Sequence, residues 1–146
     1  RSLLKKAGVS LPAKSRVELS HHYGLDRFDE FGAVLATVVN RDYCKKVIAV
    51  FPGQKNPEHL HKIKEETFVV VFGELTVTLG GDTHRLKAGD ILTVPVGVPH
   101  GFTSAGGAVF EEISSTHEGS DSYYTDESIN SNPARKTELS VWSLVG

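Results

Sequence analysis

The chain has 146 residues, of which 39% are hydrophobic and 23% charged, and its net charge is -2 at pH 7. This length is typical of one domain that buries roughly two-thirds of its unfolded surface, and the small, scattered charge argues against nucleic acid or an anionic membrane surface as the main partner. The single cysteine excludes an intrachain disulfide, and no apolar run reaches the ~18 residues of a membrane span, so we expect a cytoplasmic protein.

The N-terminal residues predict short helical elements. Residues 1–6 read as the end of a helix that Gly8 closes. Apolar residues at helical spacing within residues 24–32 predict a second short helix between two glycines. We therefore expect residues 1–32 to form a segment that packs on a barrel made by residues 33–146.

From residue 33 onward the pattern changes to short runs rich in β-branched residues. Glycine- and proline-rich turns separate the runs, and Gly73 is taken as one such turn. Strands are predicted at 33–40, 46–51, 59–61, 67–72, 74–79, 84–86, 91–94, around Phe102, and at 109–113 and 138–144. Many short strands without intervening helices predict an all-β sandwich or barrel.

The stretch 114–136 is polar, and its only aromatic residues are Tyr123 and Tyr124. Such a long connection is either an ordered loop that covers something or a mobile one. We expect a lid-like loop here.

Two histidines followed by acidic residues suggest a metal site. His59 and His61 share one face of an extended segment because side chains alternate along a strand. Glu66 lies an odd number of residues after His61, so strict alternation would turn it to the opposite face unless a bulge or turn intervenes. Glu65 lies an even number of residues after His61 and would share the face of the histidines without one. Imidazoles and a carboxylate that converge on one point are typical of a divalent transition-metal site, with His100 as the candidate for a further ligand.

These residues carry a resemblance to the cupin superfamily. Nine positions match the two cupin motifs in type and spacing, namely Gly53, His59, His61, Glu66, Gly73, Gly89, Pro95, Gly97 and His100. Ser104 stands where the second motif usually has asparagine, which is not a metal ligand in the family pattern. The resemblance implies a double-stranded β-helix, or jelly-roll barrel. It also implies one divalent metal (Mn, Zn, Fe, Co or Ni) held by His59, His61, Glu66 and His100.

Two further resemblances concern function. The segment 59–66, together with 112–114 and 121–124, is similar to sugar-handling cupins of the D-lyxose isomerase type. The whole chain also resembles the cupin module at the C-terminal end of some sialic-acid-synthase-like enzymes. Because the chain lacks methionine and starts at Arg1, we expect that its natural start is missing, either through trimming or because the sequence is a piece of a longer, multidomain chain.

An aldose–ketose isomerase needs a metal that polarises the sugar and a base that moves a proton between two carbons. Glu112 is the predicted base, and Glu111 is its alternative because strand alternation turns only one of them inward. Lys64 is the predicted second catalytic residue, as a group that stabilises an enediolate. The predicted sugar-binding residues are Lys62, Phe102, His117, Tyr123 and Tyr124.

Two other functions stay open. One is a non-catalytic, sugar-binding accessory domain of a sialic-acid-synthase-like enzyme in sialic acid biosynthesis, and the other is an Fe(II) dioxygenase, a chemistry that cupin sites also support. In each case we expect a small-molecule ligand rather than nucleic acid or membrane. The family resemblance also implies a homodimer formed through open edge strands.

Overall fold

The computed structural model describes residues 1–139 of the chain, and strands dominate its regular structure. The helical elements of this part are α1 (Ser2–Lys6), the 3-10 helix Leu25–Arg27 and α2 (Glu127–Asn130). Its strands are β1 (Arg16–His21), β2 (Gly32–Asn40), β3 (Tyr43–Val50), β4 (Lys55–Leu60), β5 (Glu66–Leu79), β6 (Asp82–Lys87), β7 (Ile91–Val94), β8 (His100–Thr103), β9 (Ala108–Ser115), β10 (Tyr123–Tyr124) and β11 (Lys136–Glu138).

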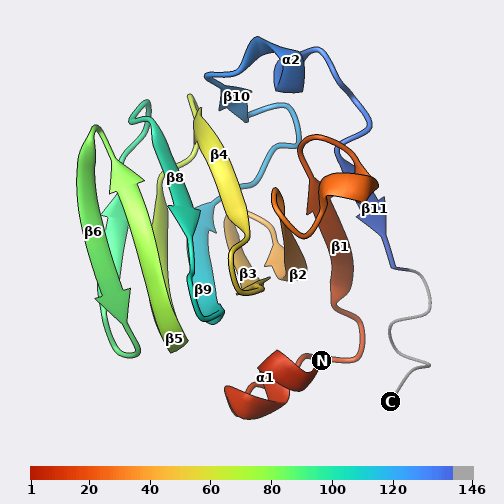
Figure 1. Cartoon of the computed structure of the whole chain (residues 1–146), viewed down its shortest axis with the longest axis vertical. Coiled ribbons are helices and arrows are strands. Elements are labelled where there is room, and N and C mark those ends of the chain that lie inside the picture. The colour runs from red at the N-terminus through yellow and green to blue at the C-terminus, as the bar shows by residue number, and fades with distance from the viewer. Residues whose placement is uncertain (140–146) are drawn as a thin grey trace.

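The strands form one curled antiparallel sheet in the order β10-β4-β8-β5-β9-β3-β2-β1-β11, with β6 and β7 also paired to β5. The first half of β5 pairs with β7 and β9, and its second half pairs with β6 and β8. Figure 1 shows the two layers that result, with β6, β5, β8 and β4 in one and β9, β3, β2 and β1 in the other. The predicted all-β jelly-roll fold is confirmed.

The expected turn at Gly73 is wrong, because β5 is one continuous strand of 14 residues. Its pairing with β9 shifts register between Val70 and Phe72, and Gly73 follows with a φ of +76°. A bulge followed by a left-handed glycine bends a strand without ending it. The glycine therefore marks the corner where β5 passes from one layer to the other.

Replacing Gly73 with alanine is expected to destabilise the fold strongly. A Cβ there would lie 2.2 Å from the carbonyl oxygen of Gly107, in addition to the left-handed backbone strain. Gly53 has a φ of +83° but no atom within 4 Å of its would-be Cβ, so Gly53→Ala is the matched control for strain alone. We expect a loss of about 1–2 kcal/mol for Gly53→Ala and more than about 3 kcal/mol for Gly73→Ala in urea unfolding. Equal losses would contradict this account of the corner.

The N-terminal region differs in part from its prediction. The helix at its start is present as α1, but the helix expected within residues 24–32 is a single 3-10 turn. The strand β1, which was not predicted, pairs with β2 and with β11. The last predicted strand begins early as β11, and its remainder, residues 140–146, lies outside the described part of the chain.

Two apolar clusters lie on the two faces of the curled sheet. The inner cluster occupies part of the barrel interior and includes Phe68, Phe102 and Phe110. The outer cluster lies where Leu3 and Leu4 of α1 pack with Val17 and its neighbours. Phe68, Phe102 and Phe110 close one part of the barrel, so polar groups that point inward gather in the remaining part.

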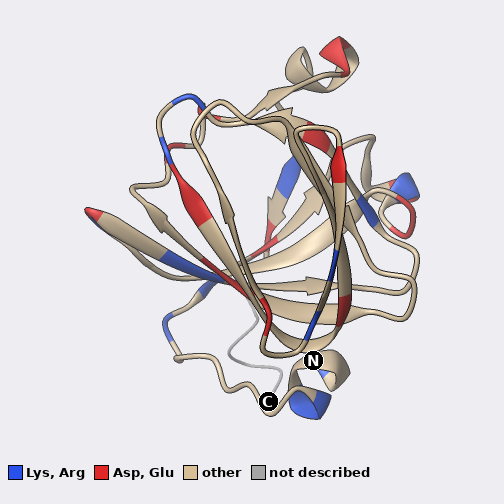
Figure 2. Cartoon of the chain, turned by 90° about the vertical axis from the view of Figure 1, so that its left-hand side faces the viewer, with Lys and Arg blue, Asp and Glu red and all other residues tan. Residues whose placement is uncertain are grey.

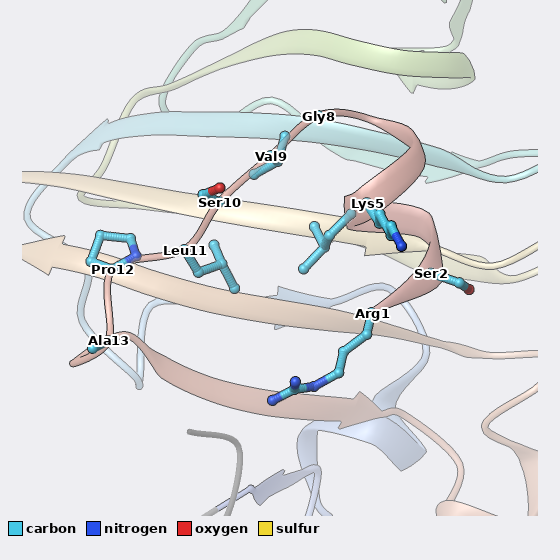
Figure 3. Close-up of a pocket in the computed structure, with 10 residues that line it drawn as sticks. Arg1, Ser2, Lys5, Gly8, Val9, Ser10, Leu11, Pro12 and Ala13 are labelled. Carbon is cyan, nitrogen blue, oxygen red and sulfur yellow. The ribbon is translucent and has the colours of Figure 1, made fainter. Parts of the chain in front are cut away.

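A groove of about 760 Å³ lies between α1 and residues 8–13, outside the barrel (Figure 3). Its lining is mostly aliphatic and backbone, with Arg1 and Lys5 as the charged members. It contains none of the histidines or acidic residues that the sequence singles out. The chemistry therefore lies elsewhere.

Basic and acidic residues are interspersed around the barrel, as Figure 2 shows. Within residues 1–139 no helix combines the length and the apolar character needed to cross a membrane.

Candidate metal centre

Four predicted ligands converge inside the barrel. His59 lies near the end of β4, His61 just after it, Glu66 starts β5, and His100 starts β8 directly opposite His59. All four are buried, and one ligand atom from each lies within 4.8 Å of the others. Three neighbouring strands thus bring together residues that are up to 41 positions apart in the chain.

Backbone carbonyls orient all three imidazoles in the same way. The Nδ1 atoms of His59, His61 and His100 lie 2.9, 2.7 and 2.9 Å from the carbonyl oxygens of Pro57, Asp121 and Val98. Because a carbonyl only accepts, each Nδ1 must carry the proton, which leaves the Nε2 lone pair free in the neutral ring. This is the tautomer that a metal-binding histidine needs.

Glu66 lies at the centre of this cluster. Its Oε1 lies 2.8 Å from Nε2 of His100 and 3.2 Å from Nε2 of His61. Burial alone would raise the pKa of Glu66, but contacts with His100 and His61 outweigh it and hold that pKa well below its usual range. The carboxylate is therefore ionised at neutral pH.

Two polar atoms of the cluster lack a hydrogen bond of acceptable geometry, namely Oε2 of Glu66 and Nε2 of His100. Burial, followed by its neighbours His100 and His61, lowers the pKa of His59 well below its usual value, so that ring is neutral. Imidazoles whose Nδ1 atoms face backbone carbonyls, together with an ionised carboxylate that has an unsatisfied oxygen, fit a divalent cation. The cluster could therefore bind a metal ion.

The chain reaches Glu66 through a bend rather than a bulge within a strand. β4 ends at Leu60, residues 61–65 form no strand, and β5 begins at Glu66. The bend returns the Glu66 side chain to the face of the histidines, from which strict alternation would turn it away. It leaves Glu65 exposed, so the structure brings Glu66 rather than Glu65 to the histidines.

Glu112 faces the same interior from β9. It is 7% exposed, and its Oε2 has no hydrogen bond. Burial and the nearby Glu66 charge raise the pKa of Glu112. Glu111 points to the other face and pairs with Lys45 at 2.8 Å, so alternation turns Glu112 inward.

Lys64 joins the two carboxylates. Its Nζ lies 3.4 Å from Glu66 and 3.5 Å from Glu112, and 3.1 Å from Nδ1 of His117. Burial would lower the pKa of Lys64, but the Glu112 and Glu66 charges raise it above the usual value. Lys64 is therefore a buried ammonium group between the two acids.

Lys46 is a buried residue of the site that its residue type did not predict. It lies on β3 directly opposite Glu112, is 2% exposed, and lines the cavity beside the cluster. Burial lowers its pKa to about 8, despite the nearby Glu112 charge. Lysine normally signals a solvated position, and only the even spacing of Cys44, Lys46 and Ile48 indicated that it faces inward.

Replacing Lys46 with methionine is expected to stabilise the protein by about 1–3 kcal/mol at pH 7, because it removes a buried charge while keeping the side-chain volume. The pKa of Lys46 is about 8 in the folded protein, against the usual 10.5 in the unfolded chain. Between these two pH values the unfolded chain binds more protons than the folded protein, so the stability of the wild type rises with pH. The gain from Lys46→Met should therefore shrink as pH rises from 8 toward 10.5 in urea titrations.

The matched control is Lys45→Met, at the neighbouring position on the outer face of the sheet. Lys45 is 43% exposed in its pair with Glu111, so its replacement should change stability by less than about 0.5 kcal/mol. Equal effects of the two lysine substitutions at pH 7 would refute the buried-charge interpretation.

Residues 116–126, called here the covering segment, lie over the cluster. Tyr124 pairs with His59 across β10 and β4, and its ring centroid lies 5.0 Å from that of His59. Asn130 accepts from the backbone N–H of Tyr124 and donates to its carbonyl, both at 2.8 Å. The stretch 114–136, for which the sequence leaves an ordered or a mobile loop open, is thus an ordered connection. It crosses one end of the barrel, where Figure 1 shows β10 and α2.

The cavity beside the cluster has a volume of about 50 Å³. The covering segment contributes His117, Ser122 and Tyr124 to its wall, and the barrel contributes Phe102 and Phe68. Burial raises the pKa of Tyr124 to about 12, and burial with the Lys46 and Lys64 charges lowers that of His117 to about 2. A neutral phenol and a neutral imidazole therefore face the acids and the lysines.

Two of the predicted sugar-binding residues lie outside this cavity. Lys62 and Tyr123 are exposed, and the Lys62 Nζ lies 4.1 Å from the centroid of the Tyr123 ring. Ser104, at the departure from the cupin pattern, is buried and donates to the Glu74 carbonyl oxygen at 2.6 Å. The serine thus ties the end of β8 to the second half of β5, away from the histidines.

The fold and the cluster define a class: a jelly-roll protein with a candidate metal centre of three histidines and one glutamate inside the barrel. In sequence, the Cupin_2 family (cupin domain) matches residues 46–115, which contain all four candidate ligands.

Comparison with known proteins narrows this class. The chain is 30% identical to D-lyxose ketol-isomerase of Cohnella laeviribosi, over 90% of this chain and 88% of that protein. It is 27% identical to D-lyxose/D-mannose isomerase of Thermosediminibacter oceani, over 89% and 88%. In structure it matches L-ribose isomerase of Cellulomonas parahominis with a TM-score of 0.74 at 17% identity, over 89% of both chains, which concerns the fold alone. The chain belongs to the cupin superfamily, and within it resembles members that are named sugar isomerases.

Proposed function

We propose that this protein is a metal-dependent aldose–ketose isomerase that acts on a monosaccharide. The observation that carries the proposal is that a four-residue candidate metal cluster lies beside a separate buried carboxylate, Glu112, on the same cavity. The Oε2 atom of Glu112 contacts Lys64 at 3.5 Å and has no hydrogen bond. Similarity along almost the whole chain to enzymes named D-lyxose ketol-isomerase supports an aldopentose as substrate.

His59, His61, Glu66 and His100 would hold the metal, which supplies polarisation of the sugar carbonyl and the neighbouring hydroxyl. Glu112 then acts on carbon. It takes the proton from C2 as the C2–H bond breaks and returns it to C1, while the hydroxyl proton moves from O2 to O1. The raised pKa of Glu112 suits a group that must both accept and release a proton.

Lys64 and Lys46 supply positive charge on either side of Glu112. Lys64 approaches both acids, and Lys46 has no ion pair within 4.0 Å among residues 1–139. Ammonium donors near the reacting oxygens stabilise the negative charge that develops there as the proton leaves carbon. Phe102 and Tyr124 would form the walls around the sugar.

Entry of a sugar requires the covering segment to move. Pockets for small ligands usually have volumes of about 300–1,000 Å³, whereas this cavity has about 50 Å³. His117, Ser122 and Tyr124 are the wall residues that belong to the covering segment, whose only strand is the two-residue β10 at the edge of the sheet. We propose that residues 116–126 act as a lid, and that Lys62 and Tyr123 lie on its outer rim.

The test is a screen of aldopentoses and aldohexoses for ketose formation by the purified protein, with and without added Mn²⁺, Co²⁺, Zn²⁺, Fe²⁺ or Ni²⁺. Ketose that forms only with metal supports the proposal. Metal and sugar binding without turnover would instead support the accessory, sugar-binding domain of a longer enzyme. Oxygen consumption with a diketone or thiol substrate would indicate a dioxygenase.

A further inference from the structure

Asp121 makes an unusual set of contacts with the bend between His61 and Glu66. It belongs to the covering segment and is 1% exposed. Its Oδ1 accepts from the backbone N–H groups of Lys62 and Ile63 at 2.8 and 3.1 Å. Its Oδ2 accepts from Ile63 and Lys64 at 3.2 and 3.1 Å. One carboxylate thus satisfies three consecutive backbone donors that no strand pairs.

The backbone of the same residue orients a candidate metal ligand. The carbonyl oxygen of Asp121 accepts from Nδ1 of His61 at 2.7 Å. His59 and His100 instead use carbonyls two residues away from themselves. His61 is therefore the one histidine of the cluster whose orientation depends on a segment 60 positions away in the chain.

We propose that Asp121 is a positioning residue that couples metal binding at the cluster to the seating of the covering segment. Its carboxylate shapes the bend that returns Glu66 to the histidine face, and its carbonyl directs Nε2 of His61 toward the same point. The inference rests on the metal centre of the proposed function.

The coupling is reciprocal. If a seated covering segment favours the ligand arrangement that binds metal, metal must favour the seated segment by the same factor, which is typically about 5–150-fold for coupled sites. The seated segment also carries Tyr124, whose backbone pairs with His59, and His117, which lies 3.1 Å from Lys64. Metal loading therefore assembles both the cluster and the wall of the sugar cavity.

The primary test uses the wild-type protein. Hydrogen exchange would be followed by mass spectrometry in the metal-free protein and with Mn²⁺ at saturation, after calorimetry has shown that Mn²⁺ binds. We expect exchange in residues 116–126, which supply no metal ligand, to slow by about tenfold. Slowing confined to β4, β5 and β8 would overturn the coupling, whereas an absence of Mn²⁺ binding would count against the metal centre itself.

Variants separate positioning from simple destabilisation. Asp121→Ala should weaken Mn²⁺ binding by about 10–100-fold, and the milder Asp121→Asn by about tenfold. Both variants should also change the visible absorption spectrum of the Co²⁺ form. The matched control is Asp126→Asn, which removes a charge from the same segment while keeping a good helix cap for α2. Wild-type affinity and an unchanged Co²⁺ spectrum in both Asp121 variants would overturn the proposal, and the wild-type exchange test decides it if neither variant folds.

Discussion

Glu112→Gln is expected to lower isomerase turnover by about 10²–10⁴-fold while leaving the metal content unchanged. Glutamine keeps the shape of the side chain but has no basic oxygen to accept the proton from carbon. Glu112 lies outside the four-residue cluster, so its loss removes no ligand. The measurement is steady-state kinetics on the substrate found in the screen, together with elemental analysis of the same preparation.

The control for this substitution is Glu111→Gln. Glu111 occupies the adjacent position on β9 but pairs with Lys45 on the outer face. It should keep turnover within about threefold of wild type, because surface substitutions away from special features have small effects. Normal turnover in Glu112→Gln, or equal losses in both variants, would refute the assignment of Glu112 as the base.

Glu66→Gln is expected to weaken metal binding by more than about 100-fold, since even residues that only support a ligand typically cost 10–100-fold. The variant keeps the three imidazoles but removes the one anionic ligand. Wild-type protein gains about 2.7 kcal/mol of stability at a metal concentration 100 times its dissociation constant, and Glu66→Gln should lose that gain at the same concentration. Calorimetric titration and thermal unfolding with and without EDTA measure both effects.

Glu65→Gln is the comparison that makes this test specific. The two glutamates are neighbours in sequence, and alternation from His61 alone favours Glu65. Because Glu65 is exposed, its replacement should leave metal affinity and the response to EDTA as in wild type. A loss of affinity in Glu65→Gln but not in Glu66→Gln would contradict the geometry of the cluster.

Much of the fold follows from local sequence. The β-branched runs between glycine and proline turns mark β2, β3 and β7 closely, because strand propensity and turn chemistry agree there. The four candidate ligands follow from face alternation combined with the spacing of the cupin motifs. Such features depend on residues that are close in sequence or at fixed distances from one another.

The missed features depend on contacts that sequence spacing does not reveal. β1 is paired along both edges, but its faces are only partly buried. Its sequence therefore has a mixed polar pattern rather than a clear alternation. Gly73 looks like any turn glycine, and only its pairing with Ala108 on β9 shows that β5 continues through it. The roles of Lys46 and Asp121 arise from burial beside partners far away in the chain, which residue type alone argues against.

Solvent deuterium exchange tests the central claim most directly. The metal-loaded protein would be incubated with D-lyxose in D₂O, and the sugar would be followed by proton NMR. We predict that the corresponding ketose forms and that deuterium enters its C1, because the proton that Glu112 takes from C2 of D-lyxose exchanges with solvent before or between transfers. Glu112→Gln should show neither change. Metal-loaded protein that binds the sugar but yields neither ketose nor deuterium incorporation would contradict the account.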